Sequence, residues 1–364
     1  LSMTKAAELA KMGEVLTNSQ IGGRRNIVIN GGMQISQRST SETGKGDADG
    51  YFTLDRYKIN VGATSAGRFT MSQSTDTPNG FGNSLKIDCT TADTSIAAGE
   101  RLTIDHRIEG QNLQQVKKGT SDAEKMTISF YAKVVGSATD FVVDLMDNDN
   151  TRQVSNLFTF TTSWVRYYWT IPADTTGAFD NDNANSLNIQ FWLHGGSTYT
   201  SGTLNTSWAS STDANRAVGI DSIFSSTDNE IYLTGIQLEV GEQATPFEHR
   251  SFGEELQLCQ RYFEYRTGGI SSGIANSGSS VQSTLSFHVT KRAAPTTALV
   301  GTPIGNDGTQ EQNVTGINNN FNIGVQGTLI DLACSLSNTT SPKSPALIYS
   351  NPATPSAITL DAEL

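Results

Sequence analysis

Apolar and polar residues alternate in short runs between residues 26 and 240, which is the pattern of β-strands with one buried face. In the runs 84–89 and 126–134 every second residue is apolar. The predicted strands are 27–29, 51–59, 67–72, 84–89, 126–134, 141–145, 157–160, 164–171, 187–193 and 231–240. Because no amphipathic helix separates them, the pattern predicts an antiparallel sandwich closed as a jelly roll.

Two segments interrupt this pattern. Residues 105–122 are polar, with Ile108, Leu113 and Val116 as sparse apolar positions. Residues 195–230 are rich in Gly, Ser, Thr and Asn, and contain Tyr199 and Trp208. A connection of this length is too long to be a simple turn, so we expect it to have a role of its own.

The stretch from Ile231 to Tyr265 predicts three kinds of backbone in succession. Gly235 breaks the alternation of the 231–240 strand and predicts a bulge. Pro246 then holds the chain extended, since the residue before a proline avoids helical geometry. Ser251 and Glu254 have the spacing of a capping box, which predicts a short helix that starts at about this point.

The helix leads into a second, smaller β-sandwich, whose predicted strands include 285–289, 298–300, 321–325, 328–332 and 346–349 and whose last residues should pair as an edge or closing strand. At the other end, residues 2–17 predict a short amphipathic helix. It either bundles with copies of itself or lies on the next domain. The sequence thus predicts an all-β chain: an N-terminal helical segment (1–23), a jelly roll (24–250) and a C-terminal β-sandwich (251–364).

Composition narrows the classes of function. The 364 residues carry a net charge of −11 with a pI of about 4.8, which argues against attraction to nucleic acid or to an anionic membrane. Cys89, Cys259 and Cys334 are unclustered and predict neither a disulfide framework nor a zinc site. No apolar run is long enough to span a bilayer. Because the first residue is Leu1 and no signal peptide follows it, we expect a processed chain or a piece of a longer protein.

The junction motif Thr234-Gly-Ile-Gln-Leu-Glu-Val-Gly, followed by Cys259-Gln-Arg-Tyr-Phe, resembles the junction between a carbohydrate-binding-type jelly roll and a tip domain in bacteriophage tail-fibre proteins. Residues 25–38, 54–57, 207–209, 215–219, 291–296 and 361–364 resemble further segments of that family, in the same order. The resemblance covers roughly residues 24–364.

The resemblance implies a subunit of a virion fibre that assembles as a homotrimer, attaches to other tail or capsid proteins through its N-terminal side and adheres to a glycan of the host surface. Two alternatives stay open: a purely structural fibre without glycan binding, and a polysaccharide depolymerase.

Catalytic and metal motifs are weak in this sequence. It has no serine nucleophile elbow, no His-Glu-x-x-His and no phosphate-binding loop, so we predict no enzyme activity and no cofactor. Asp105, His106 and Glu109 are the nearest approach to an acid/base cluster, and a surface loop is the better interpretation. The Asp/Asn turns at 47–50, 147–150 and 180–183 have oxygen ligands that suit Ca²⁺, but such turns usually bond their own backbone, and we predict no metal site.

Glycan binding calls for an aromatic side chain to stack on a sugar ring and for polar groups to bond its hydroxyls. Tyr199 and Trp208 are the predicted aromatic plates because they lie in the long polar connection. Their predicted polar partners are Asn205, Asp213, Asn215 and Arg216. The alternative for Trp208 is structural, with its ring pinning the loop to the sandwich.

Overall fold

Two six-stranded antiparallel sheets build the first of two units, which comprise Leu1–Ser251 and Phe252–Leu364. The computed structural model describes residue 5 and residues 25–63, 65–277, 279–321, 323–334, 336 and 345–364. Apart from residue 5, the helix predicted at 2–17 lies outside the described residues.

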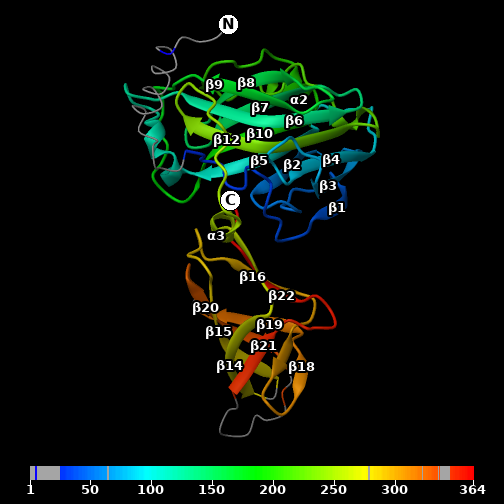
Figure 1. Cartoon of the computed structure of the whole chain (residues 1–364), viewed down its shortest axis with the longest axis vertical. Helices are drawn as coiled ribbons and strands as arrows, with labels where there is room; N and C mark the ends of the chain where they lie inside the picture. Colours follow the sequence, from blue (N-terminus) through cyan, green and yellow to red (C-terminus); the bar gives the residue numbers. More distant parts are fainter. Residues whose placement is uncertain are drawn as a thin grey trace. The chain divides into compact units, whose positions relative to one another are not determined.

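The two sheets of the first unit are drawn in Figure 1. Sheet A has the order β1 (Ser41–Lys45), β3 (Arg68–Ser74), β4 (Ser84–Thr91), β12 (Glu230–Val240), β6 (Met126–Val135) and β9 (Val165–Ile171). Sheet B has the order β11 (Ala209–Ser210), β8 (Arg152–Thr159), β7 (Asp140–Asp147), β10 (Asn185–Gly195), β5 (Arg101–Glu109) and β2 (Tyr57–Gly62). The predicted all-β fold with an antiparallel jelly-roll sandwich is confirmed.

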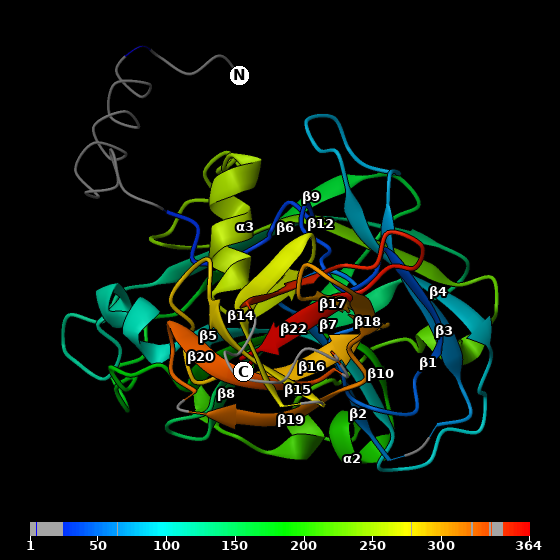
Figure 2. The same ribbon diagram turned by 90° about the horizontal axis from the view of Figure 1, so that it is seen from below.

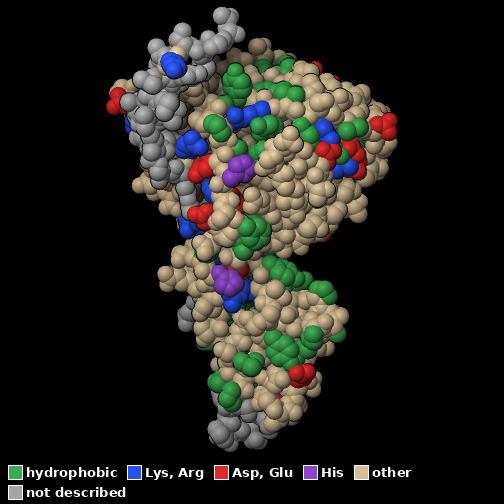
Figure 3. Space-filling view, viewed as in Figure 1, with side chains coloured by type: hydrophobic (Ala, Val, Ile, Leu, Met, Phe, Trp, Pro, Cys, Tyr) green, Lys and Arg blue, Asp and Glu red, His purple; other side chains and the backbone are tan. Residues whose placement is uncertain are grey.

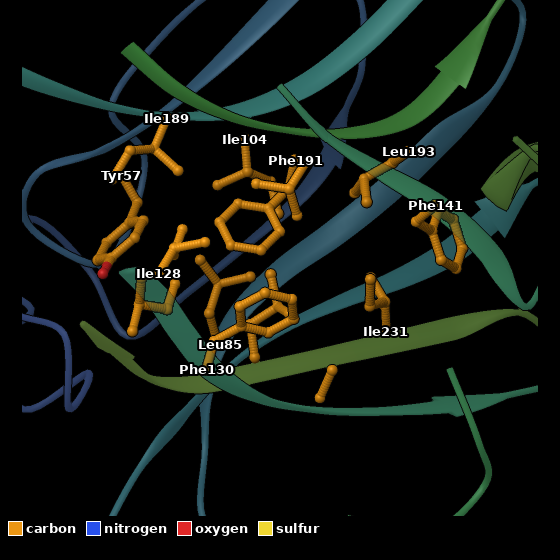
Figure 4. Packing of buried hydrophobic residues seen from close by; sticks show 14 of the residues in the cluster. Tyr57, Leu85, Ile104, Ile128, Phe130, Phe141, Ile189, Phe191, Leu193 and Ile231 are labelled. Atoms are coloured by element: carbon orange, nitrogen blue, oxygen red, sulfur yellow. The ribbon is translucent and has the colours of Figure 1, made fainter. Parts of the chain in front are cut away.

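Alternation along the strands directs apolar side chains from both sheets into a common core. Figure 4 shows them pointing toward one another, and Phe130 of β6 meets Phe191 of β10 edge-on with ring centroids 5.2 Å apart. The other labelled members are Tyr57, Leu85, Ile104, Ile128, Phe141, Ile189, Leu193 and Ile231. Each large apolar side chain that is buried here stabilises the fold by roughly 1.5–3 kcal/mol.

Two predictions for the first unit need correction. Strand β5 occupies Arg101–Glu109, although the sequence predicted a polar excursion from residue 105. Its charged residues alternate with Ile104 and Ile108, so the charges lie on one face of a real strand. Residues 27–29, in contrast, form no strand: Ile27 donates its N–H to the carbonyl of Leu238, and the chain then turns at Asn30, whose φ is +59°.

The bulge predicted at Gly235 is confirmed. Its φ is +62°, and the register between β12 and β6 shifts between Thr234 and Gln237. A side chain at position 235 would also meet the ring of Phe81, because an ideal Cβ there lies 2.7 Å from that ring. Glycine is therefore required both for the backbone angle and for the space.

Lys118 holds together the loops that follow β5 and β7 and the loop that follows β9. It comes just after two short turns, η1 (Gly110–Asn112) and η2 (Gln114–Val116), and its side chain is almost completely buried. The ammonium donates to Asp147 Oδ2 at 2.6 Å and to the carbonyls of Thr176 and Gly177 at 2.9 and 2.8 Å. Asp174 Oδ2 lies 3.1 Å away, so four oxygens surround one cation.

The second unit is also a sandwich, entered through helix α3 (Phe252–Gln260). Its larger sheet, sheet D, has the order β18 (Glu311–Asn313), β17 (Ile304–Asn306), β21 (Pro345–Tyr349), β14 (Gly269–Ser277), β15 (Ser280–Ser286), β20 (Gly327–Ala333) and β19 (Gly316–Phe321). Sheet C has the order β13 (Phe263–Arg266), β22 (Ala357–Asp361) and β16 (Thr296–Val300). Figure 2 labels β15, β20 and β19 of this sheet near one another, seen from below.

The predicted closing strand at the C-terminus is β22. It lies at the centre of sheet C, between β13 and β16, and its Ile358 and Leu360 join the core of the second unit. Strand β14 was not predicted, because its run of Gly and Ser residues shows little alternation. Of the helices in the described parts of the chain, none is long and apolar enough to cross a membrane.

Candidate functional site

The long connection between β10 and β12 folds onto sheet B. It contains helix α2 (Ser197–Thr200), the edge strand β11 and two short turns, η3 (Asp213–Asn215) and η4 (Ile223–Ser225). Strand β11 pairs with β8 through Ala209 and Ser210, so the connection is hydrogen-bonded to the edge of the sheet. All six predicted glycan-binding residues lie in this connection.

Tyr199 lies in a small apolar cluster on the outer face of sheet B. Its ring packs against Trp192 of β10 with centroids 5.1 Å apart, and the Arg101 guanidinium lies over the Tyr199 ring, 5.6 Å from its centroid. Val142 and Ala217 complete the buried cluster. The ring is therefore mostly covered by protein, which leaves little of its face for a sugar.

Arg216 is buried beneath the connection and paired with Asp144 of β7. The guanidinium donates to Asp144 Oδ2 at 2.6 and 3.0 Å, it also donates to Gln190, and it lies 5.1 Å from the centroid of the Trp192 ring. Burial lowers the pKa of Arg216, but the adjacent Asp144 carboxylate outweighs burial and raises it. The pair fixes the connection to the sheet.

Asn205, Asn215 and Asp213 line the turns of the connection. The backbone carbonyl of Asn205 accepts from Ser155 of β8 at 2.6 Å, and Asn215 Oδ1 accepts from the N–H of Thr203 at 2.9 Å. Asp213 is exposed and lies 3.9 Å from Arg216. Asn215 Nδ2 also donates to Asn205 Oδ1 at 3.4 Å, so these polar residues contact one another within the connection.

Trp208 belongs to a different cluster from Tyr199. Its indole N–H donates to the carbonyl of Pro172 at 2.9 Å, its own carbonyl accepts from Arg152, and Lys118 lies 5.3 Å from its ring. The ring packs against the main core, which fits the structural alternative. The two aromatic residues do not form one platform, and a glycan-binding role for the six residues stays a prediction.

The part of sheet B next to this connection presents rows of polar side chains outward. Register aligns Lys58, Asp105, Gln190, Asp144 and Ser155 in one row across five strands. The adjacent row consists of Arg107, Asn188, Met146 and Gln153, and we call it the Asn188 row. Both rows point away from the core, because their strand neighbours, such as Ile104 and Ile189, point into it.

Asn188 and Gln153 each carry a buried polar atom without a hydrogen-bond partner among the described residues. Asn188 Oδ1 is an unbonded acceptor on a side chain that is 7% exposed, and Gln153 Nε2 is an unbonded donor on a side chain that is 0% exposed. An unmet buried group of this kind costs about 1–3 kcal/mol. A ligand hydroxyl could offset this cost at Asn188, whereas Gln153 lies beneath the connection, where Ser211 and Thr212 donate to its Oε1. The partly exposed side chains of Arg107 and Met146 lie on either side of Asn188 in the register.

The sequence did not single out this row. Asn188 and Gln153 are polar residues in alternating strands, and that pattern is the same whether the polar face meets water or a ligand. The only available signal was the density of polar residues on β5, β7, β8 and β10 together. This density indicates one shared surface only when the order of the strands in the sheet is known, and the sequence does not reveal that order.

Two carboxylates that could be considered for glycoside cleavage lie on this face, but protein groups already donate hydrogen bonds to both of them. Asp105 and Asp144 flank Gln190, one on each neighbouring strand. Asp105 accepts from Thr103, Asn60 and Gln190, whereas Asp144 accepts from Ser155 and Arg216, and both side chains are 0% exposed. His106, the residue next to Asp105 in the predicted acid/base cluster, points to the opposite side. Burial holds its pKa well below the ordinary value.

A second group of side chains has the residue types of a catalytic triad: a serine, a histidine and a carboxylate. His194 Nδ1 lies 2.7 Å from Ser222 Oγ, and its Nε2 lies 3.1 Å from Glu100. Ser222 Oγ also accepts the N–H of Phe224 as the N-cap of η4, and His194 is buried beside the Phe224 ring. A substrate could not reach the histidine, so this group anchors the connection to β10.

Metal-binding residues do not assemble in the described parts of the chain: no group of three or more His, Cys, Asp or Glu side chains there could hold an ion. In the predicted Asp/Asn turns, the Asp147 carboxylate accepts a hydrogen bond from Lys118, and the Asp182 carboxylate accepts one from the backbone N–H of Ala184. The view in Figure 3 shows few charged side chains among a majority of uncharged surface atoms, in keeping with the 17% charged residues.

These features define an all-β protein with a jelly-roll sandwich and a polar outer face on sheet B. No family model matches the chain, and no curated protein matches it. Similar solved structures include carbohydrate-binding modules and one phage tailspike domain, all at low sequence identity.

The tailspike match is the enzymatically active domain of tailspike protein 4 of bacteriophage CBA120, with a TM-score of 0.30, 12% identity and coverage of 59% of this chain and 21% of that chain. This chain thus spans about a fifth of that protein's length. A structure titled for CBM4 matches with a TM-score of 0.30, 12% identity and coverage of 58% and 99%. TmCBM61, solved with β-1,4-galactotriose, matches with a TM-score of 0.30, 8% identity and coverage of 60% and 99%.

Proposed function

We propose that this chain is an adhesion subunit of a bacteriophage fibre and binds a host-surface glycan on the outer face of sheet B. The observation that carries the proposal is the Asn188 row, where the unbonded acceptor Asn188 Oδ1 lies beside the partly exposed Met146. Sugars present hydroxyl groups and apolar C–H faces, and this row offers a match for both. The motifs that resemble tail-fibre proteins, such as residues 234–241, support the phage setting.

Adhesion of this kind works through many weak contacts. A single hydrogen bond contributes only about 0.5–1.5 kcal/mol, so one site would bind weakly. Assembly as a homotrimer on a virion, attached to other virion proteins through the N-terminal side, would present several sites at once and raise the overall affinity. In this proposal the chain is a component of the virion, with no nucleic acid or membrane as partner.

Replacing Asn188 with alanine is the sharpest test of the site. We expect binding to a cognate glycan to weaken about 3- to 10-fold, the value of one hydrogen bond. A glycan array would identify the ligand, and calorimetry with wild-type and variant chains would measure the affinity. Asn313→Ala is the matched control, because Asn313 is an exposed asparagine of the second unit and should leave affinity unchanged.

The variant Asp213→Ala tests whether the glycan binds the sheet face or the loop residues predicted from sequence, since Asp213 is the exposed member of that group. If its loss weakens binding and the loss of Asn188 does not, the site is the connection and not the sheet. Silence of the wild-type chain across the array would favour a purely structural fibre. A fall in polysaccharide chain length during the assay would indicate a depolymerase.

A further inference from the structure

We propose that the pocket between η2 and the loop that follows β9 holds a single neutral sugar ring, as a second binding site in addition to the outer face of sheet B. This inference rests on the proposed glycan-binding function for its class of ligand. The pocket has a volume of about 380 Å³, near the lower end of the roughly 300–1,000 Å³ that is typical of small-ligand sites. A site of this size suits the end of a glycan or a short branch better than a long extended chain.

Hydrogen bonds tie the two walls of the pocket to each other. Gln114 Nε2 donates to the carbonyls of Phe179 and Asp180 at 3.4 and 3.2 Å. The ammonium of Lys118, which also lines the pocket, donates to the carbonyl of Thr176 at 2.9 Å. Because these bonds join η2 to the loop after β9 before a ligand arrives, binding requires little further ordering of the chain.

Leu113 and Phe179 give the pocket an apolar inner wall. Both residues line it, and they are only 0% and 7% exposed. A sugar ring presents C–H groups on its faces, and contact with these side chains removes apolar surface of both partners from water. Lys118 adds no uncompensated charge to this wall, because Asp147 and Asp174 lie 2.6 and 3.1 Å from its ammonium.

Three exposed side chains that line the pocket are suited to bond hydroxyl groups. The Asp122 carboxylate accepts no hydrogen bond from the described residues, and Gln114 Oε1 has no partner among them either. Lys117 Nζ donates to Glu124 at 2.9 Å, and an ammonium has two further N–H groups. The charges of Asp122 and Lys117 oppose each other, so a neutral ligand with several hydroxyl groups matches this set better than an anion or a cation.

Saturation-transfer NMR on the intact chain tests the pocket, with glucose, galactose, rhamnose and N-acetylglucosamine as probes. Ala178 lines the pocket and is exposed, so Ala178→Trp should fill it at little cost to stability and abolish transfer to the bound sugar. Ala92→Trp adds the same ring at an exposed alanine just after β4 and should leave binding unchanged. Thermal melting followed by circular dichroism checks that both variants fold.

Asp122→Ala should weaken binding of the same sugar about tenfold, the value of one hydrogen bond to a charged group. Asp228→Ala is its control, because it removes an exposed carboxylate from a turn before β12. Sugar binding that survives Ala178→Trp but is lost in Asn188→Ala would overturn the pocket and leave the proposed function intact. Absence of binding by every probe would also overturn the pocket, and the glycan array then decides the proposed function separately.

Discussion

Lys118→Met is expected to lower the free energy of unfolding of the first unit by about 3–5 kcal/mol, because it leaves buried carboxylates without their cation. Asp147, 0% exposed, would lose its 2.6 Å contact with the ammonium, and Asp174 would keep only Arg152 as a charged partner. The carbonyls of Thr176 and Gly177 would lose their donor as well. Urea unfolding followed by tryptophan fluorescence measures this, since Trp164, Trp169, Trp192 and Trp208 all lie in the first unit.

Lys117→Met is the matched control, one residue away. Lys117 pairs with Glu124 at 2.9 Å, but both side chains are about half exposed, and such surface pairs contribute about 0–1 kcal/mol. Similar losses for the two variants would contradict the role given to the buried ammonium.

Acid should reduce the difference between wild type and Lys118→Met. Burial raises the pKa of Asp174, but hydrogen bonds from Arg152 and Lys118 outweigh it and hold the pKa below its ordinary value. A depressed native pKa contributes stability that is present above the unfolded pKa, about 3.9, and is lost as the pH falls through the native pKa. The variant lacks part of this contribution, so its stability should fall less in acid.

The sequence predicted the framework of the first unit because alternation is a local signal. Strands such as β4 and β6 follow it residue by residue, and the bulge at Gly235 breaks it in a recognisable way. Strand β5 was missed entirely, because charged residues such as Asp105 and Arg107 look like a loop until both neighbouring strands are in place. The Gly- and Ser-rich β14 was missed for lack of any alternation.

The candidate site was less accessible to sequence reasoning, because it is made by contacts between distant residues. Tyr199 and Trp208 attracted attention as aromatics in a long polar connection, yet Tyr199 packs against Trp192 of sheet B and the Trp208 indole bonds the carbonyl of Pro172. Lys118 gave no local signal, since its oxygen partners lie 29 to 59 residues further along the chain. The Asn188 row exists only once the strand order of sheet B is known.

In the opening segment, the substitution Gly31→Ala should destabilise the fold more than any other added methyl group. An ideal Cβ at this position would lie 2.1 Å from the carbonyl oxygen of Ile236, a backbone atom that cannot move without shifting β12. The Gly31 carbonyl accepts the N–H of Ile236 at 3.0 Å, and Asn26 Nδ2 donates to the Ile236 carbonyl at 3.1 Å. The clash would therefore break the contact between the opening segment and the bulge of β12.

The neighbouring glycine provides the control for this prediction. At Gly32 the nearest atoms to an added Cβ are 3.6 Å away, an ordinary contact distance, so Gly32→Ala should change stability little. For Gly31→Ala we expect a loss of about 3 kcal/mol or more, the upper range for overpacking, and roughly a 6–12 °C fall in Tm. Thermal unfolding followed by tryptophan fluorescence would measure both. Equal stability of the two variants would mean that the opening segment does not need to approach β12 this closely.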